Sequence, residues 1–223
     1  DKTASFKQLE DIKIFIDPYI QYRQNIDLLL NQINENNILF IQEKMVSELQ
    51  TYKEIVFNLN NLKSGNSSGQ YFSSQSKYEP TILEEFIGFL LYPLIKNFKN
   101  LKCGPTKAYS EMNINLNIDS NNFIITDLEQ KTKNQDFSLY IEKKLTEEFI
   151  LQIPLVSIEC KTYLDKTMLE GCINTAKRIK NGNPKSNFYI VAETLDISDD
   201  ETITADEINE IYIIRKCKRR EKE

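Results

Sequence analysis

The sequence of 223 residues contains no histidine. This absence excludes the Ser-His-Asp and Cys-His triads, the nucleases that hold a metal through histidine, and histidine as the usual general base. Any catalysis by this chain must therefore rely on carboxylates, lysine, tyrosine, hydroxyl groups or a metal ion bound by carboxylates.

Cysteine is scarce, and long apolar runs are missing. The four cysteines, Cys103, Cys160, Cys172 and Cys217, are too far apart for a C-x-x-C zinc pattern, so we expect reduced and mostly buried thiols. No apolar run approaches the roughly 18 residues that span a bilayer. The first residues, DKTASFKQLEDIK, lack the layout of a signal peptide. We therefore expect a soluble, cytoplasmic protein with no membrane partner.

The net charge of −5 provides no overall attraction to nucleic acid. Basic residues nevertheless cluster at Lys177, Arg178, Lys180 and Lys185, and again in RKCKRREK at 215–222. Each cluster is either an ordinary solvated surface or a local basic face beside an acidic pocket.

The first part of the chain is expected to be helical. Apolar residues recur at three- and four-residue spacing in 9–16 and 19–33, and Asp17-Pro18 between them is typical of an N-cap followed by a first-turn proline. A third helix is expected at 38–59. These helices carry no catalytic pattern, so we assign 1–62 as a helical region for packing, DNA grip or dimer contact. The Ser-, Gly- and Gln-rich segment 63–78 is the expected linker.

The pattern changes in 79–223, which we predict to be the catalytic domain. A largely apolar helix at 79–95 is followed by strand-like segments at 111–118, 122–128, 136–144 and 154–164. A helix then begins at an Asp165 N-cap and ends at Gly182, before two strands at 186–193 and 209–216. This order predicts an α/β (α+β) fold, a mixed sheet flanked by helices.

The segment VSIECKTYLDK, 156–166, places one acid and one base in an apolar strand. Glu159 and Lys161 point to the same side, because strand side chains alternate between faces. An ion pair on an edge strand would explain them without any function. Asp136, however, begins the preceding strand and is expected near Glu159. Two carboxylates aimed at one point repel each other unless a cation lies between them, and oxygen ligands suit Mg²⁺. Lys161 would then polarise a water near the ion.

The order helix, strand with Asp136, E-x-K strand, helix, strand resembles the PD-(D/E)XK nuclease superfamily. Asp136 matches the first acid of that family's motif, and Glu159 and Lys161 match its E-x-K pair. Gln135 stands where the motif has proline, which leaves Asp127 and Asp119 as rival positions for the first acid.

The helix before the sheet often supplies a further acid in this superfamily, and the segment ILEEF offers Glu84 and Glu85. Gly88 leaves the side of Glu84 uncrowded, which favours Glu84 slightly. A solvated helix edge remains the alternative for both residues.

The segments SKYEPTILEEFIGFLL, QDFSLYIEKK, SIECKTYLDKTMLEG and EIYIIRK look like type II restriction endonucleases of the DdeI kind, across about residues 76–216. The resemblance implies Mg²⁺-dependent hydrolysis of double-stranded DNA that leaves 5′-phosphates. It also makes four basic residues candidate phosphate contacts, namely Lys166, Lys177, Arg178 and Lys180. Tyr163 and Glu193 are assigned to packing and to a strand-end charge.

The chain offers one D…E-x-K set, and therefore one active site for one strand at a time. Cutting a duplex would need two chains, either a homodimer or a heterodimer with a related subunit. Two alternatives stay open: a repair, recombination or phage-defence nuclease of the same fold, and a non-catalytic interaction module. Because the sequence stops just after a strand, it is also interpreted as a possible fragment.

Overall fold

The computed structural model describes residues 2–61, 78–119, 122–145, 147, 150–197 and 206–214, and the side chains within them except at 2–12, 61, 78–79, 109–119 and 122–130. The chain divides into two compact units, residues 1–94 and 95–223.

The described part of the first unit consists of three helices, α1 (Lys2–Gln32), α2 (Ile38–Asn61) and α3 (Tyr78–Ile95). Each contributes buried apolar side chains at helical spacing, such as Tyr22 and Ile26 on α1 and Ile41 and Met45 on α2. The rings of Tyr22 and Tyr52 stack with centroids 4.7 Å apart. The predicted third helix is confirmed by α2.

The predicted helix break at Asp17-Pro18 was wrong, because α1 runs through Pro18 without interruption. Proline in a helix interior removes one hydrogen bond and is locally unfavourable. Phe15, on one side of the proline, and Tyr22 and Ile26, on the other, are nevertheless all buried. Burial of one continuous apolar face outweighs the local cost of the proline.

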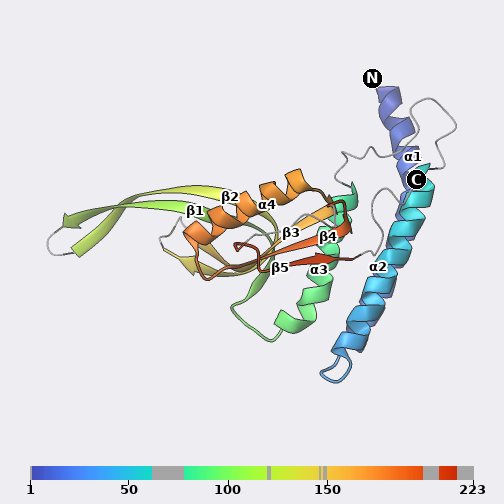
Figure 1. The fold of residues 1–223 in the computed structure, drawn as a ribbon, viewed down its shortest axis with the longest axis horizontal. Coiled ribbons are helices and arrows are strands. Elements are labelled where there is room, and N and C mark those ends of the chain that lie inside the picture. Colours follow the sequence, from blue (N-terminus) through green and yellow to red (C-terminus); the bar gives the residue numbers. More distant parts are fainter. Residues whose placement is uncertain are drawn as a thin grey trace. The chain divides into compact units, whose positions relative to one another are not determined.

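Within the described residues, the second unit is a five-stranded sheet with one helix (Figure 1). Its elements are β1 (Lys102–Asp119), β2 (Asn122–Lys144), β3 (Ile150–Leu164), α4 (Lys166–Gly182), β4 (Asn187–Leu195) and β5 (Glu210–Ile213). The strand order is β1-β2-β3-β4-β5. The first three strands are antiparallel neighbours, whereas β3–β4 and β4–β5 are parallel. The predicted mixed sheet with helices is confirmed.

The strands β1 and β2 differ from the prediction in length. Two segments, 122–128 and 136–144, were expected to be separate, yet both belong to β2, and β1 begins nine residues before the expected 111. The polar residues 129–135 carry no apolar alternation that would indicate a strand. They are in a strand because the backbone of β1 pairs with them continuously, for example Tyr109 with Thr132.

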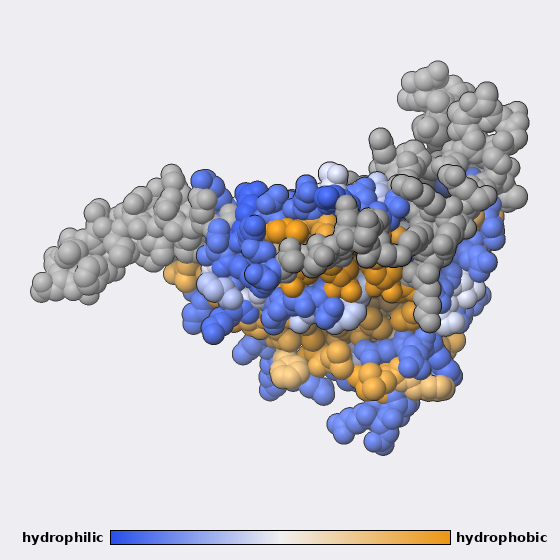
Figure 2. Space-filling model, viewed as in Figure 1, coloured by the Kyte–Doolittle hydropathy of each residue, from blue (hydrophilic) through white to orange (hydrophobic). Residues whose placement is uncertain are grey.

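The core of the second unit lies between α4 and the sheet. Leu169, Cys172 and Ala176 of α4 form a buried cluster with Phe188 and Ile190 of β4. Side chains on the other side of α4 are exposed, and hydrophilic residues cover this region of the surface (Figure 2). The position of α4 in the fold therefore follows from its amphipathic sequence.

Along the chain, the boundary between the two compact units falls between residues 94 and 95, whereas it was predicted within 63–78. Most of that segment lies outside the described residues. The difference arises because α3 packs with the other helices: Leu83 and Phe86 are buried, and the side-chain amide of Gln42 on α2 donates to the carbonyl of Leu90. Among the described helices, none is long and apolar enough to cross a membrane.

Candidate active site

Glu159 and Lys161 lie on β3, which is the central strand of the sheet. The alternative explanation, a structural ion pair, placed these residues on an edge strand. That placement is wrong, because β3 has a neighbouring strand on each side. The ion pair itself exists: Lys161 Nζ donates to Glu159 Oε1 at 2.6 Å. The Glu159 side chain is 13% exposed and that of Lys161 26% exposed, so the pair is largely withdrawn from solvent. Keeping two charges in a central strand costs desolvation energy, which is a reason to look for a function.

Asp136 lies beside this pair. The ladder between β2 and β3 includes Phe137↔Ile158, so Asp136 adjoins Glu159 where the described pairing ends. The carboxylate oxygen Oδ2 of Asp136 accepts a hydrogen bond from the backbone N–H of Cys160 at 2.9 Å. This bond fixes the carboxylate against β3.

A β-bulge sets the direction of Asp136. On β1, Gly104 pairs with Ser138 and Thr106 pairs with Gln135, so the single residue Pro105 faces both Asp136 and Phe137. Proline has no N–H to donate to the ladder, which is one reason the pairing breaks here. Bulges bend the strand and redirect side chains, often beside active sites.

The three charges act on each other electrostatically. Burial by itself would lower the pKa of Lys161, but the charges of Glu159 and Asp136 outweigh it, and the pKa is raised. Lys161 is therefore an ammonium ion at neutral pH. Its positive charge offsets the repulsion between the two carboxylates.

The residue types at this site suit a bound divalent cation, and the protein offers two carboxylate ligands for it. Asp136 and Glu159 are hard oxygen donors of the kind that Mg²⁺ prefers, and they converge where Lys161 already places a positive charge. Within the described part of the chain there is no group of three or more His, Cys, Asp or Glu side chains that could hold a metal. Two carboxylates with several waters are nonetheless a common Mg²⁺ arrangement.

The acids Glu84 and Glu85 lie on α3, in the first compact unit. Glu85 is occupied: Tyr19 OH donates to its Oε1 at 2.9 Å and to its Oε2 at 3.1 Å, and the guanidinium of Arg23 forms an ion pair with it. Arg23 also lies over the ring of Phe89, 4.2 Å from its centroid. Glu85 thus links α1 to α3, and a catalytic role for Glu84 stays a prediction from the sequence.

The rivals of Asp136 lie along the β1–β2 hairpin. Asp127 is paired with Asn115, and Asp119 with Asn122, next to the turn. Asp127 is nine residues from Asp136 on β2, which corresponds to about 30 Å of strand. The backbone therefore brings Asp136, and not these two residues, to the E-x-K pair.

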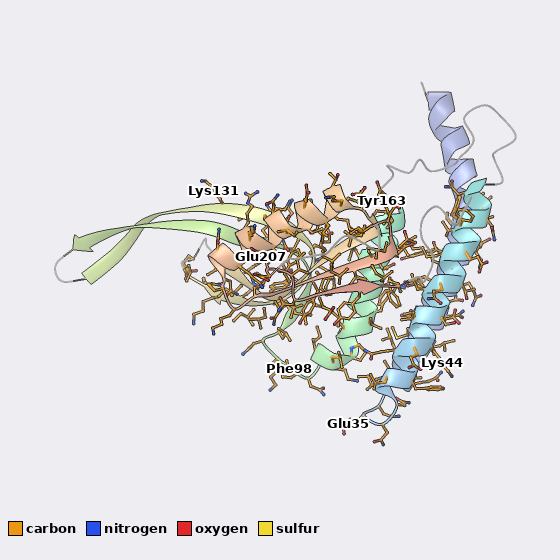
Figure 3. All side chains as sticks on the ribbon, viewed as in Figure 1. Glu35, Lys44, Phe98, Lys131, Tyr163 and Glu207 are labelled. Carbon is orange, nitrogen blue, oxygen red and sulfur yellow. The ribbon has the colours of Figure 1, made fainter. Side chains whose placement is uncertain are left out.

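The four basic residues predicted to contact phosphate lie on α4. Lys166, Lys177 and Arg178 are exposed, and Lys180 is half-buried. Lys166 and Lys177 are separated by about 20° around the helix axis, whereas Arg178 lies on another side. Lys177 Nζ is also 3.6 Å from Glu207 Oε1, a residue labelled in Figure 3. The basic tail at 215–222 is outside the described residues.

Of the two residues assigned to ordinary roles, Glu193 differs from the expected strand-end charge, because its side chain is buried within β4. Glu193 is 4% exposed and follows Ala192, the partner of Lys161 in the parallel ladder, so it belongs to the opposite face of the sheet from Lys161. Tyr163, labelled in Figure 3, is half-buried near the end of β3.

Two residues near the site were not singled out from the sequence. Burial, followed by the charge of Glu159, raises the pKa of the Cys172 thiol on α4 to about 11, while the charges of Lys161 and Lys133 act in the other direction. Cys172 therefore lies beneath the site as a protonated thiol, and Lys133 is a further cation near it. The sequence signal was weak in both cases, because Cys172 falls on an ordinary apolar helix face and Lys133 precedes the predicted start of its strand.

Comparison with known proteins yields a matching family model and a likeness to solved structures. Residues 75–223 match the family model described as Bpu10I restriction endonuclease. No curated protein matches the sequence. Among solved structures, the chain is similar to one described as "native BbvCI A2B2 tetramer at low resolution", with a TM-score of 0.64 and 24% sequence identity over 97% of this chain and 78% of that chain. At this identity the likeness shows a shared fold.

Proposed function

The chain belongs to the Bpu10I restriction endonuclease family, whose model covers more than half of it, and we propose that it hydrolyses DNA with Mg²⁺ at the site formed by Asp136, Glu159 and Lys161. Family membership confirms the predicted class, a type II restriction endonuclease acting on DNA, and disfavours a non-catalytic module. The metal dependence, the PD-(D/E)XK assignment, the DdeI kind and the cytoplasmic location stay predictions.

The observation that supports the proposal is the meeting of two carboxylates and one ammonium ion on the central strands. Asp136 and Glu159 would hold the ion, which when bound would act as a Lewis acid toward the phosphate and lower the pKa of a coordinated water. Lys161, now 2.6 Å from Glu159, would orient a water beside the phosphate. In hydrolysis this water forms the new O–P bond, the bond to the 3′-oxygen breaks, and a 5′-phosphate and a 3′-hydroxyl result.

Groups outside the D…E-x-K set have supporting roles in this proposal. The N–H of Cys160 holds Asp136 through its Oδ2, which fixes that ligand before an ion arrives. The basic residues of α4 would contact phosphates outside the reacting one.

The test is to incubate the full chain with plasmid DNA and Mg²⁺ and to sequence the ends. We expect unique ends with 5′-phosphates; heterogeneous ends would favour a repair or defence nuclease. Asp136→Asn and Lys161→Ala should each slow cleavage by at least two to three decades, or about 3–4 kcal/mol. The exposed Lys143 provides a control, since Lys143→Ala should cut at the parental rate. Cleavage by either site variant at the parental rate would refute the assignment.

Replacing the metal gives a second test. Ca²⁺ should support DNA binding without cleavage, because it accepts the same carboxylates at longer distances and with looser geometry. Full activity in excess chelator, or efficient cleavage with Ca²⁺ alone, would contradict a Mg²⁺ mechanism.

A further inference from the structure

The face of the sheet that carries the candidate site is the face that α4 covers. Glu159 pairs with Ile190 in the β3–β4 ladder, and Lys161 pairs with Ala192. Paired residues point to the same side of a sheet, and both partners belong to the buried cluster that contains Cys172 of α4. Any further residue of the site on β1 or β2 must therefore point to the α4 side as well.

Lys133 of β2 points to this side. It is paired with Ala108 of β1, which is 1% exposed and belongs to the same buried cluster. Lys133 is also close to the site along the chain, since it precedes Asp136 by three residues, or about 10 Å of strand. The long side chain of lysine can cover part of that distance. The register of β1 and β2 therefore places Lys133 on the same face as the candidate site.

The charge of Lys133 acts in the surroundings of the site. Apart from burial, the groups that act on the Cys172 thiol are, in decreasing order, Glu159, Lys161, Asp136 and Lys133. Asp136 and Glu159 supply two negative charges and Lys161 one positive charge, so these three residues together carry one excess negative charge. The positive charge of Lys133 balances it, which weakens the repulsion of an approaching phosphate.

Lys133 differs from the other lysines of the described strands, which are either paired or exposed. Ion pairs hold Lys102, Lys144 and Lys161, and the exposed ones are Lys107, Lys143 and Lys131, the last labelled in Figure 3. Lys133 is half-buried, and within the described part of the chain its ammonium forms no hydrogen bond or ion pair. Withdrawing a cation from water costs free energy unless an anion compensates it. A ligand with a negative charge would supply that compensation.

We propose that Lys133 binds the phosphate next to the reacting one and so positions the DNA strand at Asp136, Glu159 and Lys161. DNA is the substrate class of this restriction endonuclease family, and its phosphates are anions that lysine usually contacts. Consecutive phosphates of one strand advance by about 3.4 Å along the helix axis, so a neighbouring phosphate lies within reach of Lys133. The inference rests on the proposed function, which places the reacting phosphate at those three residues. In the alternative, the Lys133 ammonium lies in water and only its stem is covered.

The first experiment measures DNA affinity in chelator, where a Mg²⁺-dependent enzyme cannot cut. The probe is the plasmid fragment that the parental chain binds most tightly. Lys133→Met keeps an unbranched side chain and removes the charge; Lys143→Met is the matched control, because Lys143 is an exposed lysine of the same strand. We expect Lys133→Met to raise the dissociation constant at least about fivefold and to reduce the salt slope by about one. Lys143→Met should change the dissociation constant less than about twofold.

Two measurements separate a phosphate contact from a structural role. Lys133→Arg keeps the positive charge, so we expect it to retain most of the parental affinity. Lys133→Met should unfold at the parental urea midpoint, because it breaks no ion pair within the described residues. A lower midpoint together with unchanged DNA affinity would show a structural lysine and overturn the proposal.

The position of the contact is tested with neutral methylphosphonates that replace single phosphates on either side of the cut. If Lys133 binds one of these phosphates, replacing it should slow cleavage by the parental chain and should not slow cleavage by Lys133→Met any further. Losses that add at both positions would overturn the proposal, as would parental affinity and cleavage rate for Lys133→Met. If the parental chain binds DNA and does not cut it, the nuclease assignment fails, and the affinity measurement still decides whether Lys133 binds DNA.

Discussion

At the scale of single residues, Lys161 decides how the site behaves without metal. It donates to Glu159 at 2.6 Å and its pKa is raised by Glu159 and Asp136 against the effect of burial. Removing the ammonium would leave two carboxylates close together with the positive charge gone. A buried charge that loses its partner is strongly destabilising.

Lys161→Met should therefore lower the free energy of unfolding in chelator by on the order of 1–3 kcal/mol. Because the folded pKa of Lys161 is raised, its contribution is fully present below the unfolded pKa of about 10.4 and is lost as pH rises through the folded value. In urea unfolding, the free energy of unfolding of Lys161→Met should lie below that of the parent by a constant amount between pH 6 and 9. This difference should shrink above about pH 10.5. Lys143→Met is the exposed control, and an identical pH dependence for both variants would contradict the coupling.

At the scale of elements, α4 is fixed at its beginning by Asp165. The Oδ1 atom of Asp165 accepts a hydrogen bond from the N–H of Met168 at 2.7 Å, as the sequence predicted for an N-cap. Asp165→Ala should lower the free energy of unfolding by about 1 kcal/mol. Asp165→Asn should keep most of the parental stability, because asparagine caps equally well. Thermal or urea unfolding of the two variants measures this. Equal losses in both would mean that the charge of Asp165, and not the cap, is what stabilises α4.

If the lysines of α4 bind phosphates, they contribute to the salt dependence of DNA affinity. Removing one lysine that binds a phosphate should reduce the slope of log affinity against log salt by about one. Lys166→Ala and Lys180→Ala, made in the Asp136→Asn background to prevent cleavage, should each flatten the slope, while Lys143→Ala should not. Deleting residues 216–223 tests the basic tail in the same assay. Unchanged slopes in the lysine variants would assign this flank of α4 to solvent.

At the scale of the whole molecule, the one predicted D…E-x-K set would act on one strand at a time. We predict that the chain dimerises on DNA or requires a related subunit. Sizing the protein–DNA complex and following nicked against linear plasmid over time would test it. A strict monomer on DNA that converts plasmid directly to linear product, with no nicked intermediate, would contradict the prediction.

The sequence by itself determined the local features. The alternation in β3, the Asp165 cap and the amphipathic face of α4 are short-range patterns, and each one appears in the structure where it was predicted. The missing histidine and the E-x-K segment also narrowed the chemistry to carboxylates and lysine. These inferences depend on neighbouring residues and on residue types, which a sequence displays directly.

The tertiary structure decided what depends on residues distant in the chain. Pro18 stays inside α1 because buried side chains on both sides of it hold one face together. Glu85 is bound to Tyr19 and Arg23, more than sixty residues away. Asp136 rather than Asp127 meets the E-x-K pair because the register and a bulge opposite Pro105 bring it there. Packing and strand register are long-range properties, and for this reason no local pattern could have fixed them.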